Sequence, residues 1–122
     1  IKSEKSKDSE LILRRETERL IQILAKIPRS HVVLLDEQGK ESSTPLFLEQ
    51  IDRVRDGGRD IVYVIGGSYG VDRTLLKPYI SEYFALSPMV FPHSLALLVL
   101  LEQLYRVREI KRGSKYHHGI CK

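Results

Sequence analysis

The chain has 122 residues and a mass of 14.1 kDa, a length that predicts a single domain spanning residues 1–122 with one hydrophobic core. Its 20 Lys and Arg against 16 Asp and Glu give a net charge of +4, which suits a polyanionic partner such as a nucleic acid without requiring one. The single cysteine, Cys121, excludes an intrachain disulfide and a thiolate metal cluster, and we expect a cytoplasmic protein.

The first predicted element is an amphipathic helix. Residues 1–9 are polar, and we expect them to be frayed. Apolar residues then recur at three- and four-residue spacing up to Pro28, which ends the helix. A short apolar strand over residues 31–35 follows, with residues 36–40 as the loop after it.

A second helix and a second strand come next. Ser43 or Thr44 can cap a helix that begins at Pro45, a residue well suited to the first helical turn, and that stops at Gly57. Residues 61–65 form an unbroken apolar run, which is typical of a central parallel strand covered on both faces.

The last third of the chain repeats this alternation. Asp72 can cap a short helix that runs through Tyr79. Residues 83–86 are predicted to form a strand, and residues 94–110 the final helix. Strands that alternate with helices predict an α/β fold with a mostly parallel sheet flanked by helices.

Two strand-to-loop junctions flank a candidate ligand site. A glycine turn, Gly66 and Gly67, follows one strand, and residues 86–93 lead from the next strand directly into the final helix. In a parallel sheet both junctions would open at the carboxyl ends of the strands, where α/β proteins hold small ligands, and the glycines would let a ligand approach the backbone. The glycine spacing matches neither the P-loop nor the dinucleotide fingerprint, so a plain turn is the alternative.

The second junction is unusually apolar. Residues 89–91 are Met, Val and Phe, although they lie in a predicted loop between two prolines. Such a segment needs a cover, and two accounts remain open: core packing beneath the final helix, or a position facing a ligand that uses the free backbone groups.

The final helix begins with seven consecutive apolar residues, 95–101, which surround it on every side. We expect this segment to be buried all round, with one side on the sheet and the other under a second cover. A twofold homodimer would supply that cover, and a further N-terminal unit is the alternative. The run is far below the roughly 20 residues that cross a bilayer, and the N-terminus lacks the apolar core of a secretory signal, so we expect no membrane segment.

Four motifs follow one another along the chain: Ile65-Gly66-Gly67-Ser68-Tyr69-Gly70, Phe91-Pro92-His93, Leu101-Glu102-Gln103-Leu104-Tyr105-Arg106 and Tyr116-His117. In order and spacing they resemble the RlmH family of the SPOUT superfamily, the 23S rRNA pseudouridine methyltransferases. The resemblance implies a SPOUT α/β-knot, in which the C-terminal segment forms a trefoil knot. RlmH-like proteins usually carry an additional strand-helix-strand unit before the matched region. Since this chain begins with Ile1, we expect an N-terminally shortened member.

The resemblance also implies a cofactor, S-adenosylmethionine, and its binding site. The glycine turn and the loop after the last strand would surround the cofactor, with a leucine closing a third side. The cofactor-binding residues so implied are Leu35, Gly66, Gly67, Leu86, Ser87, Met89, Phe91 and Pro92.

Histidines are candidates for removing a proton. No acidic or thiol partners stand at ligand spacing around His93, His117 and His118, so we expect no metal site. Methylation of N3 of a pseudouridine requires the loss of its proton, which a neutral imidazole can accept, with Asp36 or solvent as rivals. In RlmH-like proteins a Tyr-His pair near the C-terminus lies close to the active site. The catalytic candidates, which would face the RNA or assist proton removal, are His93, Arg106, Tyr116 and His117.

The final helix ends in a basic segment, Arg108, Lys111, Arg112 and Lys115, with tyrosines nearby. A solvated helix end is one interpretation, because cations suit the C-terminal helix dipole. Contact with RNA phosphates, with tyrosines stacking on bases, is the other. RlmH-like sequences commonly carry an arginine four residues after the histidine of the Pro-His pair. This chain has Leu97 there, and Arg106 is the nearest cation that could replace it.

The resemblance to the RlmH family implies a methyltransferase that transfers a methyl group from S-adenosylmethionine to N3 of a pseudouridine in 23S, large-subunit, ribosomal RNA. The same pattern leaves two alternatives. One is a SPOUT methyltransferase that acts on tRNA. The other is a non-catalytic RNA-binding or ribosome-assembly module, which Leu97 and the shortened N-terminus favour.

Overall fold

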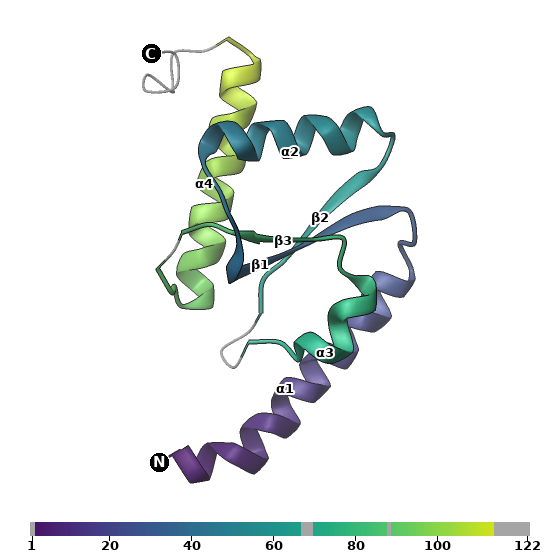
Figure 1. The fold of residues 1–122 in the computed structure, drawn as a ribbon, viewed down its shortest axis with the longest axis vertical. Helices are drawn as coiled ribbons and strands as arrows, with labels where there is room; N and C mark the ends of the chain where they lie inside the picture. The colour runs from purple at the N-terminus through teal and green to yellow at the C-terminus, as the bar shows by residue number, and fades with distance from the viewer. Residues whose placement is uncertain (1, 67–69, 88, 114–122) are drawn as a thin grey trace.

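The computed structural model describes residues 2–66, 70–87 and 89–113 and contains a three-stranded sheet with helices packed on both faces (Figure 1). The predicted α/β class is confirmed. The elements are α1 Lys2–Ala25, β1 Ser30–Glu41, α2 Thr44–Asp56, β2 Asp60–Val64, α3 Arg73–Leu76, the 3₁₀ turn Lys77–Tyr79, β3 Glu82–Ala85 and α4 His93–Lys111.

The strand order is β2-β1-β3, and both neighbouring pairs are parallel. The expectation that residues 61–65 form the central strand is wrong for the described part of the chain, because β2 lies at the sheet edge and β1 lies at the centre. The reason can be seen in β1 itself, where Val32, Val33 and Leu34 are each at most 5% exposed. A strand buried at consecutive positions is covered on both faces.

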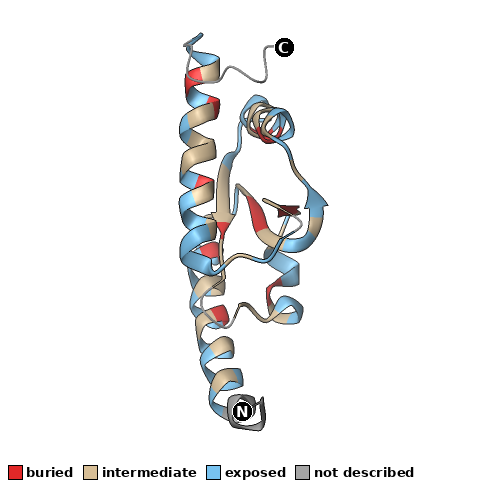
Figure 2. Ribbon diagram, turned by 90° about the vertical axis from the view of Figure 1, so that its left-hand side faces the viewer, coloured by how far each residue is buried: buried red, intermediate tan, exposed pale blue. Residues whose placement is uncertain are grey.

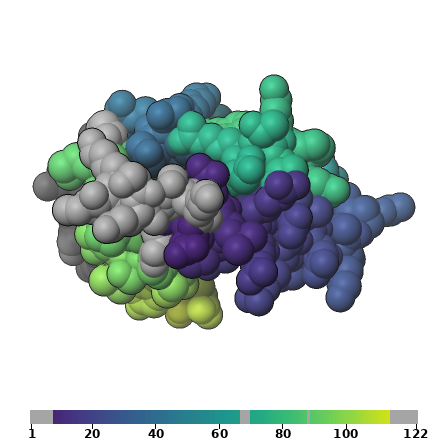
Figure 3. Space-filling model, turned by 90° about the horizontal axis from the view of Figure 1, so that it is seen from below, coloured from purple at the N-terminus to yellow at the C-terminus, as the bar shows by residue number. Residues whose placement is uncertain are grey.

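Alternate residues of β1 divide the core into two clusters. Val32 and Leu34 belong to a cluster with Leu24 of α1 and Leu76 of α3. Val33 belongs to a second cluster, whose other buried members are Phe47, Phe84, Leu100 and Val107 from α2, β3 and α4. Successive side chains of a strand point to opposite faces, so α1 and α3 cover one face of the sheet while α2 and α4 cover the other. Figure 3 shows α1 in purple beside the green segment that contains α3.

The first strand does not end where the sequence predicts. Instead of a loop over residues 36–40, β1 continues to Glu41 with an irregularity in its pairing to β3 between Leu35 and Lys40. A Cβ atom on Gly39 would lie 2.6 Å from the backbone nitrogen of Phe84, so the residue at this position must be glycine for the two strands to approach.

Two helix starts match the capping signals in the sequence. Ser43 caps α2 by accepting a hydrogen bond from the backbone N–H of Leu46, and Asp72 caps α3 through the N–H of Leu75. The N-terminus differs from expectation, because α1 already begins at Lys2 rather than after a frayed segment. Residues 2–9 contain only Lys, Ser, Glu and Asp, with no Gly or Pro to interrupt a helix.

The outer side of α4 is exposed in a single chain. Leu95, Leu97, Leu98 and Leu101 are between 41% and 63% exposed, whereas Leu100 is buried. Figure 2 shows pale blue, exposed residues along much of α4. The expectation that this helix is buried on every side is therefore wrong for one chain alone, although its inner side does pack on the sheet as expected.

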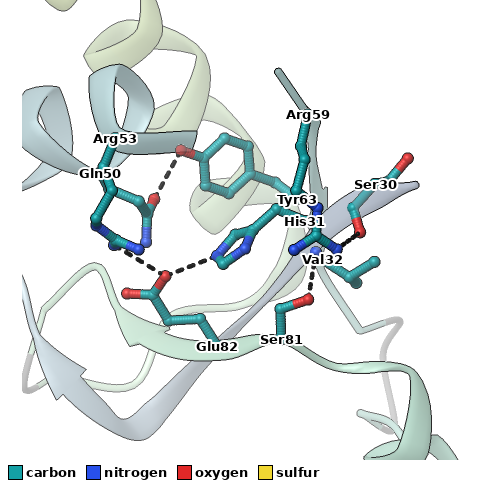
Figure 4. A network of polar contacts seen from close by, with 9 residues as sticks. All are labelled: Ser30, His31, Val32, Gln50, Arg53, Arg59, Tyr63, Ser81 and Glu82. Carbon is teal, nitrogen blue, oxygen red and sulfur yellow. Dashed lines mark hydrogen bonds and ion pairs between the residues drawn. The ribbon is translucent and has the colours of Figure 1, made fainter. Parts of the chain in front are cut away.

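A polar network near the amino-terminal ends of the strands joins β1, β3 and α2 (Figure 4). One carboxylate oxygen of Glu82 lies 2.9 Å from His31 Nε2 and 3.3 Å from Arg53 Nη2. Burial opposes ionisation of Glu82, but hydrogen bonds from His31, Gln50 and Arg53, together with the charge of Arg53, outweigh it and lower the pKa of Glu82. The hydroxyl of Tyr63 donates to Gln50 Oε1 at 2.8 Å, and burial, helped by the charge of Glu82, raises the pKa of Tyr63.

Candidate cofactor pocket

A cavity of about 310 Å³ opens at the carboxyl ends of the three parallel strands. This is the edge of an α/β sheet at which small ligands bind, and the volume lies at the lower end of the range of roughly 300–1,000 Å³ for small-molecule sites. Its walls come from the irregular stretch of β1, from the segments that follow β2 and β3, from α3 and from the start of α4. The lining residues are Leu34, Leu35, Asp36, Glu37, Ile65, Gly66, Gly70, Val71, Arg73, Leu86, Ser87, Met89, Phe91, His93 and Ala96.

Six of the eight residues that the family resemblance implies for the cofactor surround this cavity. They come from three separate segments of the chain: Leu35, Gly66, Leu86, Ser87, Met89 and Phe91. Of the remaining two, Pro92 is exposed and does not line the cavity, and Gly67 lies outside the described residues. The geometry therefore brings most of the set together, and their role as cofactor ligands stays a prediction.

Gly66 has a different reason for being glycine from the one that the sequence suggests. A Cβ atom at this position would lie 2.9 Å from the carbonyl carbon of Gly70 and 3.0 Å from its Cα. Contacts below 3.0 Å are not tolerated by backbone atoms, so the missing side chain is needed to fold the loop back on itself.

The apolar segment 89–91 is not core. Met89 is 67% exposed and Val90 is 74% exposed, so the interpretation of core packing beneath the final helix is wrong for both residues. Met89 and Phe91 line the cavity, and the hydroxyl of Ser87 accepts a hydrogen bond from the backbone N–H of Met89 at 3.0 Å. This contact fixes the backbone of Met89 beside Ser87, which also lines the cavity.

An ion pair that the sequence analysis missed lies in the wall of the cavity. Arg73 Nη2 is 2.6 Å from a carboxylate oxygen of Asp36, whose side chain is only 8% exposed. Arg73 Nη1 donates to Gln38 Oε1 at 2.6 Å, and the backbone N–H of Gln38 donates to Asp36 at 2.9 Å. The two charged residues are 37 positions apart. One sequence signal could have pointed to this pair. Asp36 directly follows the predicted strand over residues 31–35, and Arg73 stands at a helix start beside the glycine turn.

The two catalytic candidates within the described residues, His93 and Arg106, do not share the cavity. His93 is the first residue of α4 and lines the cavity. Arg106 does not line it and instead pairs with Glu102 on the same helix at 2.7 Å. Leu97, on the same helix, is exposed and is also absent from the lining. Tyr116 and His117 lie outside the described residues.

Two basic residues at the end of α4 already form ion pairs with acidic residues of the same chain. Lys111 pairs with Asp52 of α2, and Arg112 Nη1 lies 3.1 Å from Glu109 Oε2. Arg108 is exposed, and Lys115 lies outside the described residues. Because α4 has 19 residues, this end stands about 27 Å from His93 along the helix. In one chain, the basic segment and the cavity are therefore at opposite ends of α4.

Two further properties of the described ranges bear on the possible chemistry. No helix in them is long and apolar enough to cross a membrane. The same residues include no group of three or more His, Cys, Asp or Glu placed to hold a metal ion.

Comparisons with known proteins identify the family to which the chain belongs. A model described as a predicted SPOUT methyltransferase matches residues 1–117. Ribosomal RNA large subunit methyltransferase H of Nitrosomonas eutropha is 42% identical over 121 residues, which cover 98% of this chain and 76% of that protein. The protein of the same name from an Anaeromyxobacter species is 49% identical over 96 residues, 78% of this chain and 62% of that protein. The one from Desulfitobacterium hafniense is 41% identical over 112 residues, 90% of this chain and 68% of that protein.

Proposed function

Because the chain belongs to the SPOUT methyltransferases and, within them, to the family of ribosomal RNA large subunit methyltransferase H, we propose that it methylates N3 of a pseudouridine in 23S ribosomal RNA with S-adenosylmethionine as donor. The chain spans between 62% and 76% of the length of the three relatives compared above. The observation that supports the proposal most is the cavity at the carboxyl ends of the strands, around which six implied cofactor residues gather.

The residues around the cavity fit S-adenosylmethionine in their chemistry. Leucine, methionine and phenylalanine side chains offer apolar surface for an adenine ring, and Asp36 and Glu37 offer negative charge near which a sulfonium is favourable. When bound, the cofactor supplies a methyl group that its sulfonium already activates. The task left to this chain is to orient the two reactants, to exclude water and to accept one proton.

His93 and Asp36 are the groups of the cavity wall that can accept that proton. His93 is exposed at the start of α4, where an RNA base can reach it, whereas the Asp36 side chain is 8% exposed and already paired with Arg73. We therefore favour His93 over Asp36. Tyr116 and His117 remain candidates from the family resemblance, and Arg106, held by Glu102, is better placed to support α4 than to touch the base.

RNA would be held by the basic end of the last helix, namely Arg108, Lys111, Arg112 and Lys115. Since this end stands one helix length from the cavity in the same chain, the RNA would have to extend along α4 or contact a second copy. A homodimer formed through the exposed leucines of α4 would provide such a copy and cover the apolar face. The reaction would take place in the cytoplasm, with the ribosomal RNA. The C-terminal trefoil knot, which includes residues outside the described ranges, belongs to the same proposal.

The test is transfer of a labelled methyl group to defined RNAs. We would incubate the chain with S-adenosylmethionine and, separately, large-subunit ribosomal RNA, assembled large subunits and bulk tRNA, and then map the product by mass spectrometry of digested RNA. A methylated pseudouridine in the large-subunit RNA is expected. Methylation of tRNA alone would favour the tRNA enzyme, and cofactor binding without any transfer would favour the non-catalytic module.

A further inference from the structure

We propose that Arg73 binds the α-carboxylate of S-adenosylmethionine and thereby selects ligands that carry the intact amino-acid moiety. This inference rests on the function proposed above. It concerns a residue that the sequence analysis did not single out and that lies in none of the four family motifs.

The first argument is charge complementarity. Among the described residues that line the cavity, Asp36 and Glu37 carry negative charge, and Arg73 is the one with a permanent positive charge. At neutral pH the ligand carries a positive sulfonium, a positive α-ammonium and one negative α-carboxylate. The three side chains together carry a net charge of −1, which complements the net charge of +1 on the ligand in a partly enclosed site where such interactions are stronger than in water. Within this wall, Arg73 is the group that can pair with the α-carboxylate.

The second argument is the way in which Arg73 is held. Its contacts with Asp36 and Gln38, both at 2.6 Å, use two of the five N–H donors of a guanidinium. The Arg73 side chain is 45% exposed, so the group is anchored on one edge while part of it remains open to the cavity. A fixed planar fork is well matched to a carboxylate and loses little entropy on binding it.

The third argument is the rigidity of the support. The backbone N–H of the preceding residue, Asp72, donates to Thr17 Oγ1 at 2.9 Å, and Thr17 is fully buried. Asp36 is itself 8% exposed in its side chain and is fixed by the N–H of Gln38. Arg73 is thus positioned from α1 on one side and from β1 on the other before any ligand arrives.

The experiment compares two ligands that differ only beyond the sulfur atom. S-adenosylhomocysteine carries the amino-acid moiety, and 5′-methylthioadenosine lacks it. Calorimetric titration of both ligands into the wild-type chain and Arg73→Gln should show the affinity for S-adenosylhomocysteine falling by about ten- to a hundredfold, the range for a hydrogen bond to a charged group. The affinity for 5′-methylthioadenosine should stay within about twofold of wild type, since it makes no contact with Arg73.

Two further variants complete the design. Arg14→Gln removes an exposed cation of α1 and should leave both affinities unchanged. Arg73→Lys keeps the positive charge but loses the planar pair of N–H donors. It should therefore lower the affinity for S-adenosylhomocysteine less than Arg73→Gln does. If Arg73→Gln fails to fold, the ratio of the two affinities in Arg73→Lys decides, and a ratio equal to that of the wild type overturns the proposal.

The remaining outcomes are also decisive. Equal weakening of both ligands by Arg73→Gln would mean that Arg73 only supports the loop, which overturns the inference. Unchanged cofactor affinities with weaker RNA binding would assign Arg73 to an RNA phosphate and overturn it as well. If the wild-type chain binds neither these ligands nor S-adenosylmethionine, the proposed function fails first, and the result is distinguishable from a failure of Arg73 alone.

Discussion

The hydroxyl oxygen of Thr17, in the middle of α1, accepts a hydrogen bond from the backbone N–H of Asp72 at 2.9 Å. The same hydroxyl donates to the carbonyl of Leu13 at 2.8 Å. A side chain with no exposed surface thus joins the N-terminal helix to the residue that caps α3, directly after the glycine turn. The first helix is in this way part of the frame that positions the cavity wall.

The first prediction concerns this contact. Thr17→Val has nearly the same shape but leaves the partly buried N–H of Asp72 without its partner, which should lower the free energy of unfolding by about 1–2 kcal/mol. Thr17→Ser keeps the hydroxyl and should lose less. Thr74→Val, at an exposed position of α3, is the matched control and should change stability by less than about 0.5 kcal/mol. Urea unfolding measures all three, and equal effects of the two valine variants would contradict the role of Thr17.

The second prediction concerns the glycine turn. Gly66→Ala would force the loop away from Gly70, at a cost of about 1–3 kcal/mol. It should weaken the binding of S-adenosylmethionine and lower the melting temperature, and the free-energy change should be larger for binding than for unfolding. The control is Gly57→Ala, because a Cβ atom there has its nearest neighbour at an ordinary 3.5 Å. Calorimetry and thermal unfolding check the two effects. Wild-type affinity in Gly66→Ala would show that the loop closure at Gly70 is not needed for the site.

The third prediction concerns pH. The pKa of Glu82 is below its ordinary value of 4.5, so its stabilising effect is complete above that value and is lost as the pH falls through the lower pKa of the folded state. We expect Glu82→Gln to be less stable than the wild type by about 1–2 kcal/mol at pH 7 and to lose less stability on acidification. Glu49→Gln, at an exposed position of α2, is the control. Parallel stability curves for wild type and Glu82→Gln would contradict the assignment.

The fourth prediction concerns self-association. Leu98 is 63% exposed in one chain, so Leu98→Arg should leave the protomer folded, as judged by circular dichroism, but dissociate a dimer that covers α4. Ile23→Arg changes a residue of α1 with 58% exposure and should not alter the association state. Sedimentation at micromolar concentration distinguishes the two variants. A wild-type chain that sediments as a monomer there would contradict the proposed homodimer.

The order and type of the elements could be predicted from local chemistry. Local signals act within a few positions of the chain, as do the capping residues Ser43 and Asp72 and the apolar run of residues 61–65. The elements that they specify can therefore be predicted from neighbouring residues alone. The centre of the sheet could not be predicted in this way. Whether β1 or β2 is central depends on which strands pair, and this is decided by contacts between distant segments.

The cavity was predictable only in part, for the same reason. Its position at the carboxyl ends of parallel strands follows from the fold class, and the family resemblance supplied most of the apolar residues. The pair of Asp36 and Arg73 depends on the irregular stretch of β1 after Leu35, which a pattern of apolar residues does not reveal. Gly39 marks that stretch, but its close approach to Phe84 becomes visible only in three dimensions.

The measurement that tests the central claim most directly is a crystal structure of the chain with S-adenosylhomocysteine. We predict that the ligand occupies the cavity between Leu35, Gly66 and Leu86, with its carboxylate toward Arg73 and its sulfur on the side of His93. Ligand density at another place on the protein, with this cavity left empty at saturating ligand concentration, would contradict the assignment of the cofactor site.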